Sequence, residues 1–99
     1  MVVTMKVSDP GWIAPYFENV GPLLVAYGAV QLAGGLDIVP IEGNGDTPDR
    51  IAVFAFPDMT SLNMFMADDR YQTHRALRHA GSKAEIFAFE NLVVPDRLV

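Results

Sequence analysis

Apolar residues recur along this chain at two spacings, one typical of strands and one typical of helices. Alternating apolar and β-branched residues predict four strands and one further extended segment. The strands are residues 1–7, 29–33, 50–56 and 83–91, and the extended segment is residues 36–42. We expect Gly34 and Gly35 to end the second strand, because glycine weakens a strand interior.

A long helix is predicted between the first two strands. Asp9 is placed to cap its free amides, and Pro10 fits its first position. Apolar side chains then recur at helical spacing on one face as far as Tyr27. Pro22 should bend this helix, and Gly28 should terminate it.

Two shorter helices are predicted before the last strand. Pro57 and Asp58 open the first of them. Asp68 and Asp69 interrupt it and cap a further helix over residues 70–79. This order of elements predicts one α+β domain, in which a four-stranded sheet carries helices on one face.

The alternation of side chains along the strands predicts how this sheet is covered. One face would carry small or aliphatic side chains such as Val53 and Ala55, which suit packing beneath the helices. The opposite face would carry the phenylalanines Phe54, Phe56, Phe87 and Phe89. Burying one such ring is worth about 1.5–3 kcal/mol, and a two-layer subunit has nothing to cover that face. We therefore expect a homodimer that pairs through the phenylalanine face.

Composition narrows the choice of partners. The chain has 99 residues, of which 51% are hydrophobic, and a formal net charge of −5. This charge argues against sequence-independent nucleic-acid binding and against an anionic membrane surface. The longest apolar stretch, residues 23–33, falls well short of a membrane span. Cysteine is absent, which excludes disulfides and thiolate metal sites and suits a reducing cytoplasm.

Several short stretches, taken in order, resemble a known family and together cover about residues 7–91. They are Asp9-Pro10, Tyr27-Gly28-Ala29, Leu32-Ala33-Gly34-Gly35, Asp49-Arg50, Phe56-Pro57-Asp58, Tyr71-Gln72 and Leu77-Arg78. Through them the chain resembles the domain of unknown function numbered 1330 (DUF1330), a branch of the dimeric α/β-barrel superfamily.

This resemblance implies a ferredoxin-like sandwich with an antiparallel four-stranded sheet, which forms a barrel with a second subunit. The single domain would span residues 1–99, with a core over about residues 1–91 and a tail over 92–99. The family has no established reaction. Its superfamily includes cofactor-free oxygenases, lactone isomerases and haem-degrading enzymes, which is an analogy of fold and does not assign an activity.

Three side chains with useful chemistry are predicted to share one stripe of the last helix. Tyr71, His74 and Arg78 are three and four residues apart. A guanidinium can hold an anionic group, while an imidazole or a phenol can transfer a proton. The alternative is a solvent-facing helix, with Tyr71 half buried and Arg78 paired to an acid. If Arg78 binds ligand, Arg78→Ala should weaken binding and leave the melting temperature nearly unchanged.

Aromatic and methionine side chains are candidates to line an apolar pocket between the helices and the sheet. The aromatic candidates are Trp12, Tyr16, Tyr27 and Phe65. At helical spacing, the alternative is that such side chains form an ordinary core, although a small barrel can leave part of its core open to a ligand.

No metal or cofactor is expected. His74 and His79 are five residues apart, which does not place two ligands on one helical face. Asp68 and Asp69 resemble carboxylate ligands, but their position favours helix capping.

The sequence favours binding of a small apolar or carboxylate-bearing metabolite. The expected binding residues are Arg78, Tyr27, Trp12 and Phe65, and the catalytic candidates for metal-free acid–base or oxygenase-type chemistry are His74 and Tyr71. The alternative is a non-enzymatic ligand-binding or structural dimeric module. A cavity holding Tyr71, His74 or Arg78 would favour an enzyme, one lined only by Met and Phe would favour binding, and a packed interior would favour a structural role.

Overall fold

The computed structural model describes residues 1–91, and the predicted tail over 92–99 lies outside the described residues. The elements in chain order are β1 (Val2–Val7), a 3₁₀ turn η1 (Pro10–Trp12), α1 (Ile13–Ala26), β2 (Val30–Leu36), β3 (Arg50–Ala55), α2 (Met59–Ala67), α3 (Asp69–Gly81) and β4 (Ser82–Phe87).

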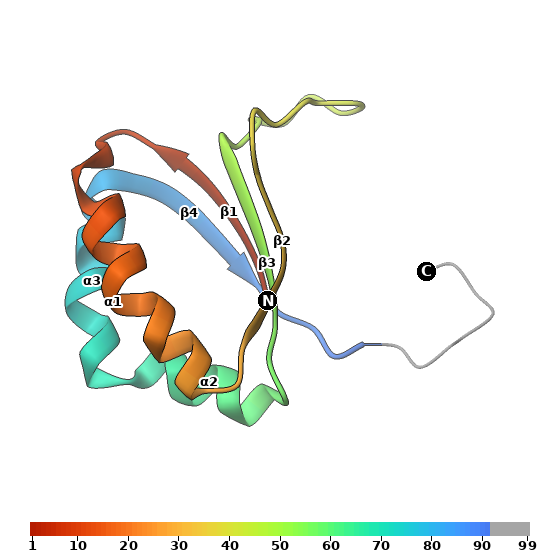
Figure 1. The fold of residues 1–99 in the computed structure, drawn as a ribbon. Coiled ribbons are helices and arrows are strands. Elements are labelled where there is room, and N and C mark those ends of the chain that lie inside the picture. The colour runs from red at the N-terminus through yellow and green to blue at the C-terminus, as the bar shows by residue number, and fades with distance from the viewer. Residues whose placement is uncertain (92–99) are drawn as a thin grey trace.

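The four strands form one antiparallel sheet in the order β2-β3-β1-β4. The three helices lie on one side of this sheet, and the other side is open (Figure 1). The predicted α+β class, with a four-stranded sheet and helices on one face, is confirmed, and the strand order is that of a ferredoxin-like fold.

Aspartates begin the helical segments, as the sequence predicts. The side chain of Asp9 accepts a hydrogen bond from the amide of Gly11. Asp58 accepts one from the amide of Ser61 at 2.7 Å, and Asp68 accepts one from the amide of Arg70 at 2.8 Å. Each bond satisfies an amide that has no partner within its own helix.

The second strand differs from its prediction, because β2 runs through both glycines and ends at Leu36. Gly34 and Gly35 pair with residues of β3 through their backbones, which requires no side chain. Asp37 then has a positive φ of 54°. Here the chain leaves the sheet and forms a long loop that extends away from the body (Figure 1). The extended segment predicted over residues 36–42 is therefore wrong as a sheet strand.

The predicted orientation of β3 is wrong, because the side chains expected on its outer face lie on the helix side. Gln31 pairs with Phe54, and Val3 of β1 pairs with Ala52. Paired residues point to the same face, and this face lies beneath the helices. The ring of Phe56 also packs against a helix, with its centroid 5.8 Å from that of Phe65.

The phenylalanines are thus divided between the two sides of the protein. Phe54 and Phe56 pack toward the helices, whereas Phe87 and Phe89 are 57% and 67% exposed. The physical reason is size. An aromatic ring beneath the helices buries more apolar area than Val53 would there, so β3 turns its larger side chains inward.

The helices pack around a small buried cluster, which consists of Val20, Leu23, Phe65 and Tyr71. At one end, α3 approaches η1 so closely that a Cβ on Gly81 would collide with Trp12. At the other end, Gly28 has a positive φ of 77°, which confirms it as the residue that ends α1.

Candidate functional site

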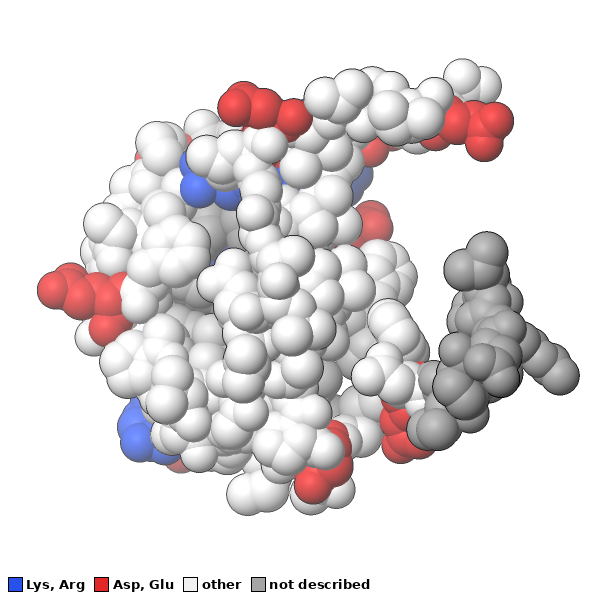
Figure 2. All heavy atoms as spheres, turned by 45° about the vertical axis from the view of Figure 1, so that its right-hand side comes forward, with Lys and Arg blue, Asp and Glu red and all other residues white. Residues whose placement is uncertain are grey.

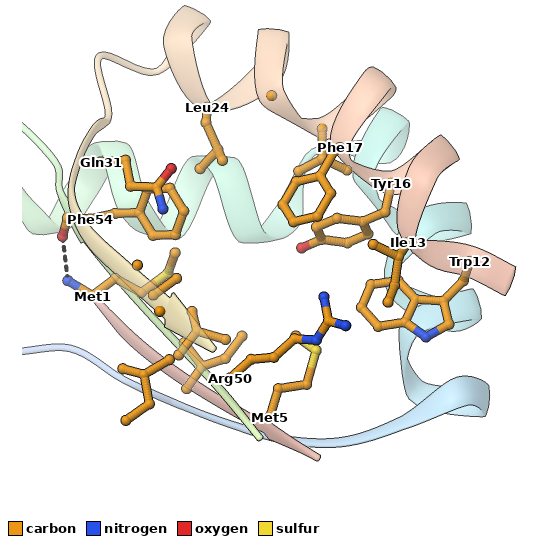
Figure 3. Close-up of a pocket in the computed structure, with 18 of the residues that line it drawn as sticks. Met1, Met5, Trp12, Ile13, Tyr16, Phe17, Leu24, Gln31, Arg50 and Phe54 are labelled. Atoms are coloured by element: carbon orange, nitrogen blue, oxygen red, sulfur yellow. Dashed lines mark hydrogen bonds between the residues drawn. The ribbon is translucent and has the colours of Figure 1, made fainter. Parts of the chain in front are cut away.

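An open cavity of about 530 Å³ lies between α1 and the sheet (Figure 3). Apolar side chains from both layers make up most of its wall, including Met1, Val3, Met5, Ile13, Phe17 and Phe54. Gly21 on α1 and Gly35 on β2 also line the cavity. A Cβ at either position would have no atom within 4 Å beyond its own local backbone.

Arg50 places a positive charge in this apolar cavity. It is the first residue of β3 and pairs with Met5, so its side chain leaves the sheet on the helix side. Its guanidinium points toward Tyr16 and Ile13 across the cavity (Figure 3). The nearest acid is Asp49, 3.8 Å from Nε, and the carboxylate of Asp49 also accepts a hydrogen bond from the amide of Val7. The terminal nitrogens of Arg50 make no hydrogen bond within residues 1–91.

Two tyrosines form the polar part of the helix wall. The hydroxyl oxygens of Tyr16 and Tyr71 lie 3.0 Å apart, within hydrogen-bond distance. Aromatic neighbours hold both rings in place. The ring of Trp12 packs edge-on against that of Tyr16, with 5.2 Å between the ring centroids. The centroids of the Phe65 and Tyr71 rings lie 4.5 Å apart. Both tyrosines line the cavity.

A buried arginine stands behind this pair. Arg78 is 2% exposed, and its terminal nitrogen Nη2 donates a long hydrogen bond of 3.4 Å to the Tyr71 hydroxyl. The same nitrogen lies 3.4 Å from Nε2 of His79. Burial, followed by the neighbouring Arg78 charge, lowers the pKa of His79, which favours a neutral imidazole beside the guanidinium.

The environment of Tyr16 favours the protonated phenol. Burial raises its pKa most, and the neighbouring Tyr71 hydroxyl adds to the rise, while Arg78 opposes it. At neutral pH Tyr16 thus presents a protonated hydroxyl, which can both donate and accept a hydrogen bond, to an apolar cavity.

The residues predicted from the sequence fall into two groups. Trp12, Phe65 and Tyr71 line the cavity, and Arg78 touches Tyr71 from behind without lining it. Tyr27 and His74 belong to the second group, because neither lies in the cavity wall.

Tyr27 instead has a partner at the junction between α2 and α3. Its hydroxyl donates a 2.6 Å hydrogen bond to the carboxylate of Asp68. Arg70 donates two more side-chain hydrogen bonds to the same carboxylate. Bonds from Arg70, and then the bond from Tyr27, hold the pKa of Asp68 well below its usual range. These contacts give Asp68 a structural role as the N-cap of α3.

The alternative interpretation of α3, a solvated stripe with Arg78 paired to an acid, is wrong. Both Tyr71 and Arg78 are almost fully buried, and His74 is half-buried. Within residues 1–91 no carboxylate lies at ion-pair distance from Arg78.

Sequence reasoning missed Arg50 because it placed β3 the wrong way round. Arg50 has the same parity as Ala52 and Phe54, so the correct orientation turns all three toward the helices. An arginine on the inward face of an otherwise apolar strand would have been the signal.

Two other kinds of site are absent from residues 1–91. No three His, Asp or Glu side chains gather there in a way that could hold a metal ion. None of the helices in this part combines the length and the apolar character needed to cross a bilayer.

The family is shown by comparison with known sequences. Residues 1–92 match the family model described as "Domain of unknown function (DUF1330)", so the chain belongs to this family, as its motifs predicted. The fold has a solved counterpart, described as the crystal structure of methylated RPA0582 protein. The two share a TM-score of 0.74 at 16% identity, over 97% of this chain and 84% of that chain.

One curated relative also matches. The chain is 35% identical over 69 residues to the "Spectinabilin polyketide synthase system protein NorA'" of Streptomyces orinoci. The match covers 69% of this chain but 2% of that protein, so the chain corresponds to a small part of its relative.

Proposed function

We propose that this protein binds an apolar small molecule that carries a carboxylate, with Arg50 holding the carboxylate and the cavity holding the apolar body. The observation behind the proposal is the Arg50 guanidinium, which enters an apolar cavity with its terminal nitrogens free of hydrogen bonds to residues 1–91. Arginine binds carboxylates through two parallel hydrogen bonds, and each is stronger because it is charge-assisted.

The size of the cavity supports a ligand of metabolite size. Its volume of about 530 Å³ lies within the range typical of small-molecule sites. An apolar cavity of this size also argues against a purely structural module, whose interior would be packed. Tyr71 lies in the cavity wall. By the criterion stated for the sequence, a cavity that holds Tyr71 favours an enzyme.

The curated relative supports the same class of ligand. Its name connects it with polyketide synthesis. Polyketide chains combine a carbon skeleton with carbonyl and carboxyl oxygens, and an apolar cavity with one guanidinium and two phenols suits such a molecule.

Fluorescence of the single tryptophan tests the proposal, because Trp12 lies in the cavity wall. Decanoate and decanol are suitable probes, since they share a chain and differ in charge. Decanoate should bind more tightly, and Arg50→Met should weaken it by roughly 10-fold or more while leaving decanol unchanged.

Lys83→Met is the matched control, because it removes a cation from β4 at an exposed position. It should leave the binding of both probes unchanged. Equal affinity for decanoate and decanol, or an Arg50→Met variant that binds decanoate as well as the wild type does, would overturn the proposal.

We also propose that the open face of the sheet pairs with a second copy of the chain. Val2 pairs with Val53 on one side and with Phe87 on the other, so these three apolar side chains form a row on the uncovered face. Phe87 and Val30 on this face are 57% and 60% exposed. The surface brought forward in Figure 2 is mainly uncharged, with charged side chains of both signs near its margins. A second copy of this face is the partner that would remove the apolar row from water, although Lys6, Lys83 and Glu85 share the face.

A further inference from the structure

A chain of polar contacts leads from the buried arginine to the cavity. Arg78 touches the Tyr71 hydroxyl, and the Tyr71 hydroxyl touches that of Tyr16. Tyr16 comes from α1, while Tyr71 and Arg78 come from α3. The cavity end of this chain is the Tyr16 hydroxyl, which Figure 3 shows pointing into the open space.

The direction of these hydrogen bonds follows from what each group can donate. A guanidinium has only donors, so the Tyr71 oxygen must accept from Arg78. Tyr71 is 1% exposed and has one remaining partner within residues 1–91, the oxygen of Tyr16. If Tyr16 were the donor, the Tyr71 hydrogen would be buried without an acceptor, which is costly.

The favoured order therefore runs from Arg78 to Tyr71 and from Tyr71 to Tyr16. The Tyr16 oxygen accepts from Tyr71, and its own hydrogen is left to point into the cavity. The positive charge of Arg78, at the start of this series of hydrogen bonds, polarises both hydroxyls in the same direction. This polarisation strengthens Tyr16 as a donor.

We infer that Tyr16 donates a hydrogen bond to a carbonyl oxygen of the bound molecule, so that the ligand class is keto acids rather than simple fatty acids. This inference rests on the proposed function, since it assumes that Arg50 holds the carboxylate. In this arrangement Arg50 binds the carboxylate of the ligand, and Tyr16 binds the carbonyl oxygen of the same molecule. Tyr71 and Arg78 are positioning residues, because they act through Tyr16.

The Tyr16 phenol carries its proton at neutral pH, as a phenol with an ordinary pKa of about 10 also does, so its hydrogen is present to be donated. Selectivity follows as well. A donor left without an acceptor in an apolar cavity disfavours any ligand that lacks the carbonyl.

The experiment compares decanoate with a set of decanoates that carry one ketone at different chain positions. In the wild type, at least one keto acid should bind roughly 2- to 10-fold more tightly than decanoate. Tyr16→Phe should abolish this preference, because it weakens the binding of the keto acids and removes the unpaired donor that disfavours decanoate. Arg50→Met should weaken all of these acids together.

A spectroscopic readout separates a direct hydrogen bond from a change in packing. The ketone stretching band of the preferred keto acid should move to lower wavenumber on binding to the wild type. The shift should disappear in Tyr16→Phe and shrink in Tyr71→Phe, which cuts the connection to Arg78 and retains the Tyr16 hydroxyl.

The outcomes distinguish the two proposals. If decanoate binds through Arg50 but Tyr16→Phe keeps the keto-acid preference and the band shift, this inference is overturned and the proposed function stands. If none of these acids binds to the wild type, both are overturned.

Discussion

The hydroxyl oxygens of Tyr16 and Tyr71 lie 3.0 Å apart, although 55 positions separate the two residues along the chain. Packing of α1 against α3 brings them together at the wall of the cavity, with Arg78 directly behind. The arrangement joins a buried charge to an apolar pocket through two phenols. It makes the fold and the candidate site depend on the same side chains.

Arg78 should therefore be important for stability, contrary to the expectation from the sequence. Its side chain is 2% exposed and fills space behind the tyrosines. Arg78→Ala should lower the free energy of unfolding by about 2–4 kcal/mol, because it leaves a void and removes the donor to Tyr71. Urea denaturation measures this loss. Glu18→Ala, at an exposed position on α1, should change stability far less, and a similar small loss for Arg78→Ala would contradict its structural role.

Two glycines should respond in opposite ways to alanine. A Cβ on Gly81 would collide with Trp12 and lie 2.8 Å from the backbone oxygen of Asp9. Gly81→Ala should therefore destabilise the fold by about 1–3 kcal/mol. Gly21→Ala is the matched variant within α1. Its Cβ meets nothing within 4 Å, so it should stabilise the protein by about 0.5–1 kcal/mol. Thermal unfolding of both variants would contradict this contrast if their melting temperatures moved in the same direction.

Stability should depend on pH through Asp68. Hydrogen bonds from Arg70, and then from Tyr27, lower the pKa of this carboxyl in the folded state. A carboxyl with a lowered folded pKa stabilises the fold above its unfolded pKa of about 3.9, and this stability is lost as the pH falls through the folded value.

Asp68→Asn isolates this charge, because asparagine can still cap α3. The variant should melt at a lower temperature than the wild type at neutral pH. The difference should shrink as the pH falls below about 4. Melting curves recorded across this range measure the effect, and a difference that stays constant down to low pH would show that the charge of Asp68 is not the cause.

Assembly should depend on the exposed ring of Phe87. Phe87→Lys places a charge in the apolar row on the open face and should shift the protein from dimer to monomer in light scattering. Leu77→Lys is the control. Leu77 is 49% exposed on α3, away from the open face, and its substitution should leave the mass unchanged. A wild-type protein that is monomeric at micromolar concentration would exclude this dimer.

Local signals in the sequence predicted most of the elements. Asp58 and Asp68 precede helical stretches, and both cap helices through their own side chains. Capping needs only residues that are close along the chain, so it can be inferred without the rest of the fold. The same holds for Gly28, which ends α1 with a positive φ.

The second strand shows where local reasoning stops. Gly34 and Gly35 have poor strand propensity, yet their backbones pair with β3. Pairing energy from a neighbouring strand overrides propensity, because the hydrogen bonds come from the backbone and not from the side chain.

The sequence by itself determined the family, the α+β class, the order of the elements and the aromatic character of the helix that carries Tyr16. Only the tertiary structure decided which way β3 faces, and with it that Phe54 lies beneath the helices and that Arg50 enters the cavity. The reason is that alternation divides a strand into two faces without naming either of them. The inward face is chosen by how well each set of side chains fits against helices that are distant in the chain.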